Sequence, residues 1–64
     1  MVIEKVGTEV HFRCPIKTMF QIESDNRKFA ISLAIDQAKS RYPNLNWENP
    51  IIMTTTYKYN EIVW

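Results

Sequence analysis

The N-terminal part of the chain alternates apolar with polar side chains, most clearly at Val10, Phe12 and Cys14, which charged or histidine residues separate. A period of two is the pattern of a strand with one buried face. The single glycine, Gly7, marks a turn between two short strands or a bulge in one long strand. Pro15 cannot donate a backbone hydrogen bond to a sheet, so we expect the strand to end or reach an edge there.

A second strand is predicted over residues 18–23, where Phe20 and Ile22 point to one side. The short gap around Pro15–Lys17 favours an antiparallel hairpin between this strand and the first. A third strand is predicted over residues 51–59, which are rich in β-branched and aromatic residues.

The third strand divides its side chains between two faces. One face carries Ile51, Met53, Thr55, Tyr57 and Tyr59. Because this set is the more apolar one, we expect it to face the core, and we expect the set that includes Lys58 to face solvent. Asn60–Glu61 is expected to turn the chain, so that residues 62–64 form a short tail strand.

One long helix is predicted between the second and third strands, over about residues 25–42. Ser24 and Asp25 are suitable N-cap residues, and Asn26 is a third candidate. Pro43 ends the helix, because the residue before a proline avoids the α conformation.

These elements predict a single α+β domain over residues 1–64, in the order β-β-α-β, with an antiparallel sheet packed against one helix. A chain this short buries only about 60% of its unfolded surface, so its stability is marginal. Cys14 is the only cysteine, so no disulfide forms within the chain, and one histidine and one cysteine cannot complete a tetrahedral zinc site. Oligomerisation or unusually good packing remains as the source of stability.

The apolar face of the predicted helix is wider than its packing requires. Ala30, Ala34 and Ala38 form its centre, which allows close approach to the sheet. Flanking apolar residues widen the arc to about 200°, where roughly 100° is sufficient for a surface helix. The residues on one flank are Ile31, Ile35 and Tyr42. Two interpretations stay open: the sheet wraps the helix and covers this flank, or the flank, or Phe29, is a docking site.

Trp47 lies in a proline-bounded loop over residues 43–50 that is longer than most connections in a compact domain. Tryptophan is enriched at binding hot spots, and loops often carry function. The alternative is that its indole closes one end of the core. The candidate protein-binding residues are therefore Phe29, Ile31, Ile35, Tyr42 and Trp47.

Aromatic and basic residues interleave in Tyr57-Lys58-Tyr59, and we expect His11 and Arg13 nearby on the sheet. Platforms that stack single-stranded nucleic acid use such groups. Two observations oppose this interpretation: the tyrosines belong to the face expected to be buried, and the net charge is only +1. Nucleic acid therefore ranks below protein as a partner.

No constellation in the chain indicates catalysis. Cys14 and His11 are three residues apart in a strand and so lie on opposite faces, and one glycine cannot form a phosphate-binding loop. We expect no enzyme activity, no cofactor and no metal. There is no apolar run of about 18 residues and no signal peptide, so we expect a cytoplasmic protein that does not enter membranes.

The run Phe20-Gln21-Ile22-Glu23-Ser24-Asp25, the alanine row and Tyr42-Pro43 resemble the strand–cap–helix unit of small phage-encoded early proteins. That group includes inhibitors of host RNA polymerase and antagonists of bacterial defence. The resemblance implies a scaffold and assigns no functional residue. Because this chain is nearly neutral, it does not resemble the acidic nucleic-acid mimics of that group.

The expected function is a non-enzymatic protein-binding module that inhibits or modulates a host protein. It would act by steric docking through exposed apolar residues and an open strand edge. A second copy of the chain is a further candidate partner. The alternatives are a small RNA- or single-stranded-DNA-binding module that uses the sheet face, and a structural subunit of a larger assembly.

Overall fold

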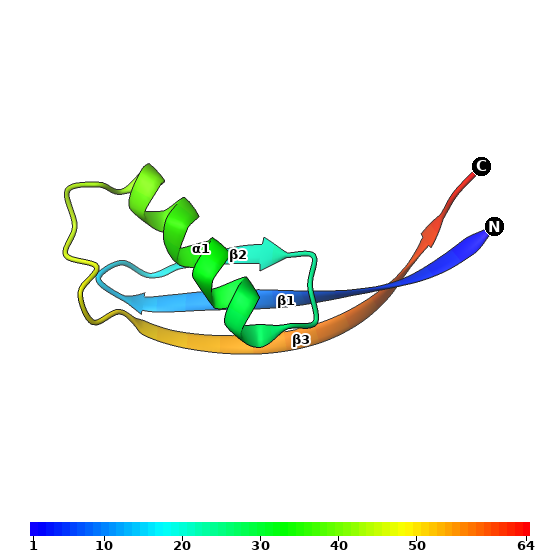
Figure 1. Ribbon diagram of the computed structural model, residues 1–64, viewed down its shortest axis with the longest axis horizontal. Coiled ribbons are helices and arrows are strands. Elements are labelled where there is room, and N and C mark those ends of the chain that lie inside the picture. Colours follow the sequence, from blue (N-terminus) through cyan, green and yellow to red (C-terminus); the bar gives the residue numbers. More distant parts are fainter.

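A computed structural model describes residues 1–64, with three strands and one helix (Figure 1). The elements are β1 (Val2–Cys14), β2 (Thr18–Ile22), α1 (Arg27–Arg41) and β3 (Ile51–Ile62). Both β2 and β3 pair antiparallel with β1, so the strand order is β2-β1-β3. The predicted α+β class and the β-β-α-β order are therefore confirmed.

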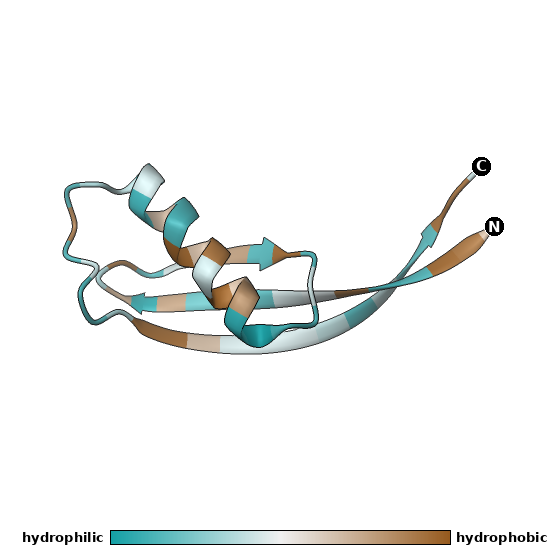
Figure 2. Cartoon of the chain, in the orientation of Figure 1, coloured by the Kyte–Doolittle hydropathy of each residue, from teal (hydrophilic) through white to brown (hydrophobic).

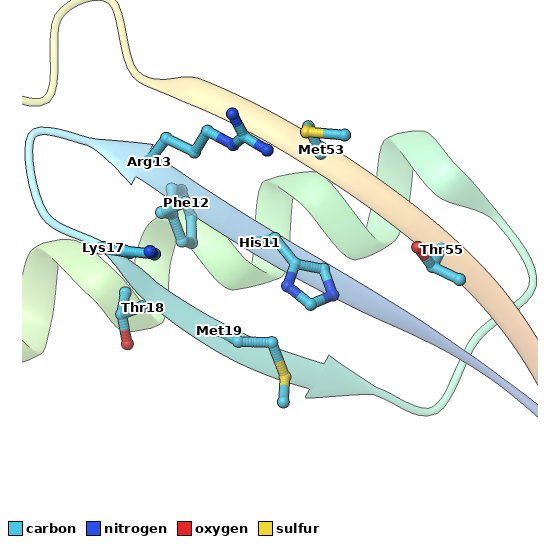
Figure 3. Close-up of a pocket in the computed structure, with 8 residues that line it drawn as sticks. All are labelled: His11, Phe12, Arg13, Lys17, Thr18, Met19, Met53 and Thr55. Carbon is cyan, nitrogen blue, oxygen red and sulfur yellow. The ribbon is translucent and has the colours of Figure 1, made fainter.

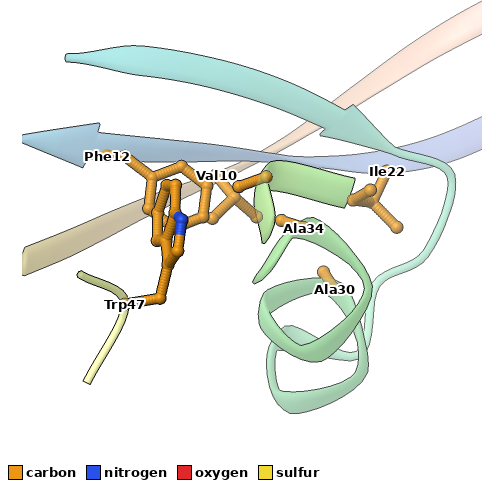
Figure 4. Packing of buried hydrophobic residues seen from close by; sticks show 7 residues of the cluster. Val10, Phe12, Ile22, Ala30, Ala34 and Trp47 are labelled. Atoms are coloured by element: carbon orange, nitrogen blue, oxygen red, sulfur yellow. The ribbon is translucent and has the colours of Figure 1, made fainter. Parts of the chain in front are cut away.

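The helix covers one face of the sheet and packs mainly against β1 and β2. Its alanine row is fully buried, because small side chains let the helix backbone come close to the strands. Phe12 and Trp47 meet edge to face beside the helix, with ring centroids 5.4 Å apart (Figure 4). The buried apolar core consists of Val10, Phe12, Ile22, Ala30, Ala34, Ala38 and Trp47.

The helix begins later than the sequence predicts. Asn26 is the N-cap, and its side-chain oxygen accepts a hydrogen bond from the N–H of Phe29 at 3.1 Å. The hydroxyl of Ser24 accepts the N–H of Asn26 at 3.1 Å and so orders the turn before the cap. The predicted cap at Ser24 or Asp25 is therefore wrong and the third candidate is right. At the other end, Tyr42 is the C-cap.

The register of β3 reverses the predicted orientation of this strand. Thr54 lies opposite Val10 and Ile52 lies opposite Phe12. Directly opposed residues share a face, and Val10 and Phe12 are buried under the helix, so the even-numbered residues of β3 face α1. The residues predicted to be buried, Ile51, Met53, Thr55, Tyr57 and Tyr59, lie on the uncovered face instead. That prediction is wrong because pairing with β1, and not the apolar content of β3, determines which face of β3 lies toward the helix.

Three further predictions for the strands are corrected. A register shift between Phe12 and Cys14 interrupts the alternation, and Cys14 is exposed instead of buried. Gly7 marks neither a turn nor a bulge, because β1 runs through it with unbroken register. The predicted turn at Asn60–Glu61 is absent, since β3 continues to Ile62.

The start of β1 and the end of β3 extend past β2 and α1 as a two-stranded ribbon, here called the arm (residues 2–6 and 58–62; Figure 1). The arm elongates the molecule to 44 × 19 × 17 Å. Its tip carries the exposed apolar residues Val2 and Ile62 (Figure 2). No third strand and no helix supports the arm, and a two-stranded ribbon alone is only marginally stable in water.

Candidate functional site on the uncovered sheet face

One face of the sheet has no helix over it, and we call it the open face. Strand alternation assigns to it every odd-numbered residue of β1, β2 and β3 up to the bulge near Cys14. The side chains that matter below are Lys5, Glu9, His11, Arg13, Met19, Met53, Thr55, Tyr57 and Tyr59. The helix α1 lies on the other side of the sheet, so it leaves these side chains uncovered (Figure 3).

A methionine–histidine–methionine row crosses the open face near the β1–β2 hairpin. His11 lies opposite Met19 on β2 and opposite Met53 on β3. Figure 3 shows the three side chains on adjacent strands, with α1 behind the sheet. Both methionines are about half exposed, at 42% and 53%. Thioether side chains adapt to differently shaped partners, so this row is suited to contact with another surface.

The row lines a shallow pocket of about 490 Å³, and Phe12 and four polar residues complete its walls. Arg13 and Lys17 lie at the hairpin end of the pocket, and Thr18 and Thr55 add hydroxyl groups (Figure 3). Neither Arg13 nor Lys17 forms an ion pair within the chain. The pocket therefore combines apolar methionine side chains with two cationic side chains that have no ion-pair partner within the chain.

Glu9 balances part of this positive charge. Its carboxylate lies 3.4 Å from Nε2 of His11 and 3.4 Å from the amide nitrogen of Gln21. A carboxylate in the middle of the open face weakens its attraction for polyanions. The open face is therefore mixed in charge, with its cations concentrated at the hairpin end.

Two stacked tyrosines occupy the other half of the open face. The rings of Tyr57 and Tyr59 lie 5.8 Å apart at an interplanar angle of 30°. The hydroxyl of Tyr59 donates to the carboxylate of Glu23 at 3.1 Å. Desolvation, followed by this hydrogen bond and the negative charge of Glu23, raises the pKa of Tyr59 above its usual value.

The arm adds an ion pair to the same face. Nζ of Lys5 lies 2.6 Å from the carboxylate of Glu61. The hydrogen bond and the charge of Glu61 raise the pKa of Lys5 above its usual value. Lys5 is therefore less available to an external anion than Arg13 and Lys17 are.

Most of the candidate protein-binding residues of the helix and loop pack against other residues of the same chain. Ile35 and Tyr42 pack against the core, and Ile31 is half buried. Trp47 is 9% exposed, and its indole N–H donates to the carbonyl of Tyr42 at 2.9 Å. Ile35, Tyr42 and Trp47 are therefore covered within the monomer and are not exposed as a docking site. Only Phe29, at 52% exposure, stands out from the helix.

The candidate nucleic-acid residues lie on one face of the sheet with one exception, although the tyrosines and the His11–Arg13 end occupy different halves of it. His11, Arg13, Tyr57 and Tyr59 share the open face, which removes the objection that the tyrosines are buried. Lys58 points to the opposite side, where its Nζ lies 3.6 Å from the carboxylate of Glu4. Met19, Met53 and Lys17 are not predicted from the sequence to belong to this site. Met53 could have been found, because it is four residues from Tyr57 in the same strand and so lies on the same face.

The structure shows no cluster of the kind that holds a metal ion. No three histidine, cysteine, aspartate or glutamate side chains gather at one point. The register shift of β1 lies between Phe12 and Cys14, and the hydrogen bond of the His11 ring goes to Glu9 and not to Cys14. Every buried side-chain polar atom has a partner, so none is left aimed at an absent group. What the arrangement offers is a surface for contact, with apolar, aromatic and cationic parts.

Comparison with known proteins gives no relative for this chain. No protein-family model, no curated protein and no solved structure matches it. Separately, α1 is too short and too polar to cross a lipid bilayer.

Proposed function

We propose that this chain is a non-enzymatic protein-binding module and that the open face is its contact surface. The observation that carries the proposal is the Met19–His11–Met53 row, exposed on a sheet face that no helix covers. Two half-exposed methionines, one on each strand beside β1, form with His11 a contiguous exposed row, and such a row on an uncovered face is typical of a contact surface.

The proposed mode of action is steric. A partner would dock its apolar side chains onto the methionine row and place acidic groups near Arg13 and Lys17. Such binding occludes whatever surface of the partner it covers, so the module inhibits or modulates the partner without any chemical step. The proposed partner is a host protein, in keeping with the resemblance to small phage-encoded early proteins.

The test is affinity capture with three forms of the immobilised chain. The first is the wild type, the second is Met19→Asp/Met53→Asp, and the third is the matched control Ser32→Asp/Ser40→Asp on the exposed side of α1. The proposal expects a discrete partner that the wild type and the control retain and the methionine variant loses. Retention of the same proteins by all three forms contradicts it, provided that circular dichroism shows each form to be folded.

A second candidate function is binding of single-stranded RNA or DNA on the same face. The observation that favours it is the placement of Tyr57 and Tyr59 on the same uncovered sheet face as His11 and Arg13. Stacking of a base on an exposed aromatic ring contributes about 1–3 kcal/mol. The low net charge and the carboxylates of Glu9 and Glu23 rank this candidate second.

Fluorescence anisotropy with labelled oligonucleotides at low salt tests the second candidate. Arg13→Glu/Lys17→Glu should abolish binding, whereas Lys58→Ala, on the opposite side of the sheet, should leave it unchanged. An equal effect of both changes, or no binding by the wild type at low salt, rules out the sheet-face mode for nucleic acid.

A further inference from the structure

The outer edge of β3 is free along its whole length. β3 is an edge strand in the order β2-β1-β3, it spans Ile51–Ile62, and α1 lies mainly over the other two strands. Long edge strands are usually protected by charged side chains, a proline, a bulge or a covering element, and the two charged side chains of β3 are each paired with a residue of β1. β3 contains no proline, and Lys58 and Glu61 are its only charged residues. It is therefore an open template for another strand.

The hydrogen-bonding direction of each β3 residue follows from the tip of the arm. Met1 and Val63 exchange both backbone hydrogen bonds, at 3.0 and 2.8 Å. Hydrogen-bonded and non-hydrogen-bonded pairs alternate along an antiparallel ladder, so the odd-numbered residues of β3 bond to β1. The even-numbered residues, including Thr56 and Lys58, direct their N–H and C=O groups outward.

We propose that this edge pairs with the β3 edge of a second copy of the chain, antiparallel and around a two-fold axis at Tyr57. The product is a continuous six-stranded sheet with both helices on one side. This inference concerns the edge and does not depend on what binds the open face.

A second copy fits because one half of β3 lacks a supporting strand and the other half can supply one. The arm half has no supporting strand or helix, whereas the other half lies beside the covered body of the domain. Antiparallel pairing places the arm of each copy against the body of the other. Every arm is then supported by a third strand, and the exposed Ile62 comes opposite the partner's Ile52.

The charges and side-chain types select the register. An axis at Tyr57 places Lys58 opposite the partner's Thr56 and Glu61 opposite the partner's Met53, so no like charges meet. An axis at Lys58 would oppose two ammonium groups. An axis at Thr56 would place Ile52 opposite the partner's Asn60, so that the apolar contact between Ile52 and Ile62 would be lost.

Light scattering on the full chain, combined with a cysteine cross-linking scan, tests the proposal. The wild type should show twice the chain mass of 7.6 kDa across micromolar concentrations. In a Cys14→Ser background, Met53→Cys/Glu61→Cys should form a covalent dimer under mild oxidation. Positions 53 and 61 lie eight residues apart in one extended strand, so they cannot bond within one chain. The two single-cysteine variants are the matched controls and should stay uncross-linked.

Thr56→Pro supplies an independent arm of the same test. The N–H of Thr56 points outward, so proline removes no bond to β1 but blocks the new edge. We expect a folded monomer, with association about tenfold or more weaker, and normal association for Thr56→Val. A wild type that is monomeric at every concentration overturns the proposal. Cross-linking of the single-cysteine variants as strong as that of the double variant overturns the register.

Discussion

The ring of Tyr57 lies directly over Gly7 on the open face of the sheet. The two residues are opposite each other in the β1–β3 ladder, and a methyl group added at Gly7 would lie 2.6 Å from Cζ of Tyr57. The absence of a side chain on β1 thus gives the aromatic ring of β3 a place to lie flat. Gly7 is explained by this contact and not by any turn or bulge.

Gly7→Ala should therefore destabilise the fold by displacing the Tyr57 ring, by about 1–3 kcal/mol. Chemical denaturation of the single variants and of the double variant Gly7→Ala/Tyr57→Ala measures the coupling. In the Tyr57→Ala background the added methyl group meets no ring, so Gly7→Ala should be neutral or stabilising there. Strictly additive effects would show that the two residues do not interact.

The helix start offers a second prediction. Asn26→Ala removes the side-chain acceptor for the N–H of Phe29 and should lower the free energy of unfolding by about 1 kcal/mol. Asp25→Ala is the matched control, because the Asp25 side chain caps nothing, and its effect should be much smaller. Equal effects of the two substitutions, measured by thermal unfolding, would return the cap to the position favoured by sequence alone.

Trp47 is predicted to be a core residue. Trp47→Ala leaves a cavity beside Phe12 and should cost about 3 kcal/mol or more, enough to unfold much of a small domain. Trp47→Phe keeps most of the packing but loses the bond to the Tyr42 carbonyl, with an expected cost of about 1–2 kcal/mol.

The readout is tryptophan fluorescence in a Trp64→Phe background, because Trp64 is fully exposed and would mask the signal. In that background the native emission should be blue-shifted and poorly quenched by iodide. Emission typical of an exposed indole would instead support the hot-spot interpretation of Trp47.

Stability should fall at alkaline pH. The pKa values of Lys5 and Tyr59 are both raised in the folded chain, Lys5 by Glu61 and Tyr59 by desolvation and then Glu23. A raised folded pKa stabilises the protonated form, so these contributions are complete below the unfolded pKa values near 10 and are lost as the pH rises through the folded ones.

Tyrosinate absorbance during a pH titration measures this effect. Glu23→Gln removes the negative charge beside the Tyr59 hydroxyl and should lower the pKa of Tyr59. Glu61→Gln removes the partner of Lys5 and should reduce the alkaline loss of stability without that shift. An unchanged Tyr59 titration in Glu23→Gln would show that desolvation alone raises its pKa.

The order of elements could be predicted from the sequence because its signals are local. Alternation at Val10 and Phe12, the proline after Cys14 and the proline after Tyr42 each act within a few residues. Close approach of the alanine row to the sheet was local in the same sense, since it depends only on helical spacing.

The orientation of β3 could not be predicted, because it depends on non-local pairing. The more apolar, odd-numbered face of β3 is the one that the sequence predicts to be buried, but the even-numbered Thr54 and Thr56 face the helix side, since they lie opposite Val10 and Thr8. The core tolerates threonines there because α1 lies over β1 and β2 and scarcely covers β3. The β3 part of the candidate site could not be predicted for the same reason, since Met53, Tyr57 and Tyr59 belong to the set expected to be buried.

The most direct test of the open face as the binding surface is a methyl NMR titration with a partner purified by the capture experiment. With methyl-labelled methionine and alanine, we predict that the Met19 and Met53 signals shift or broaden on binding while those of Ala30, Ala34 and Ala38 do not. Unchanged Met19 and Met53 signals in a complex that forms would contradict the account and move the binding surface to another part of the fold.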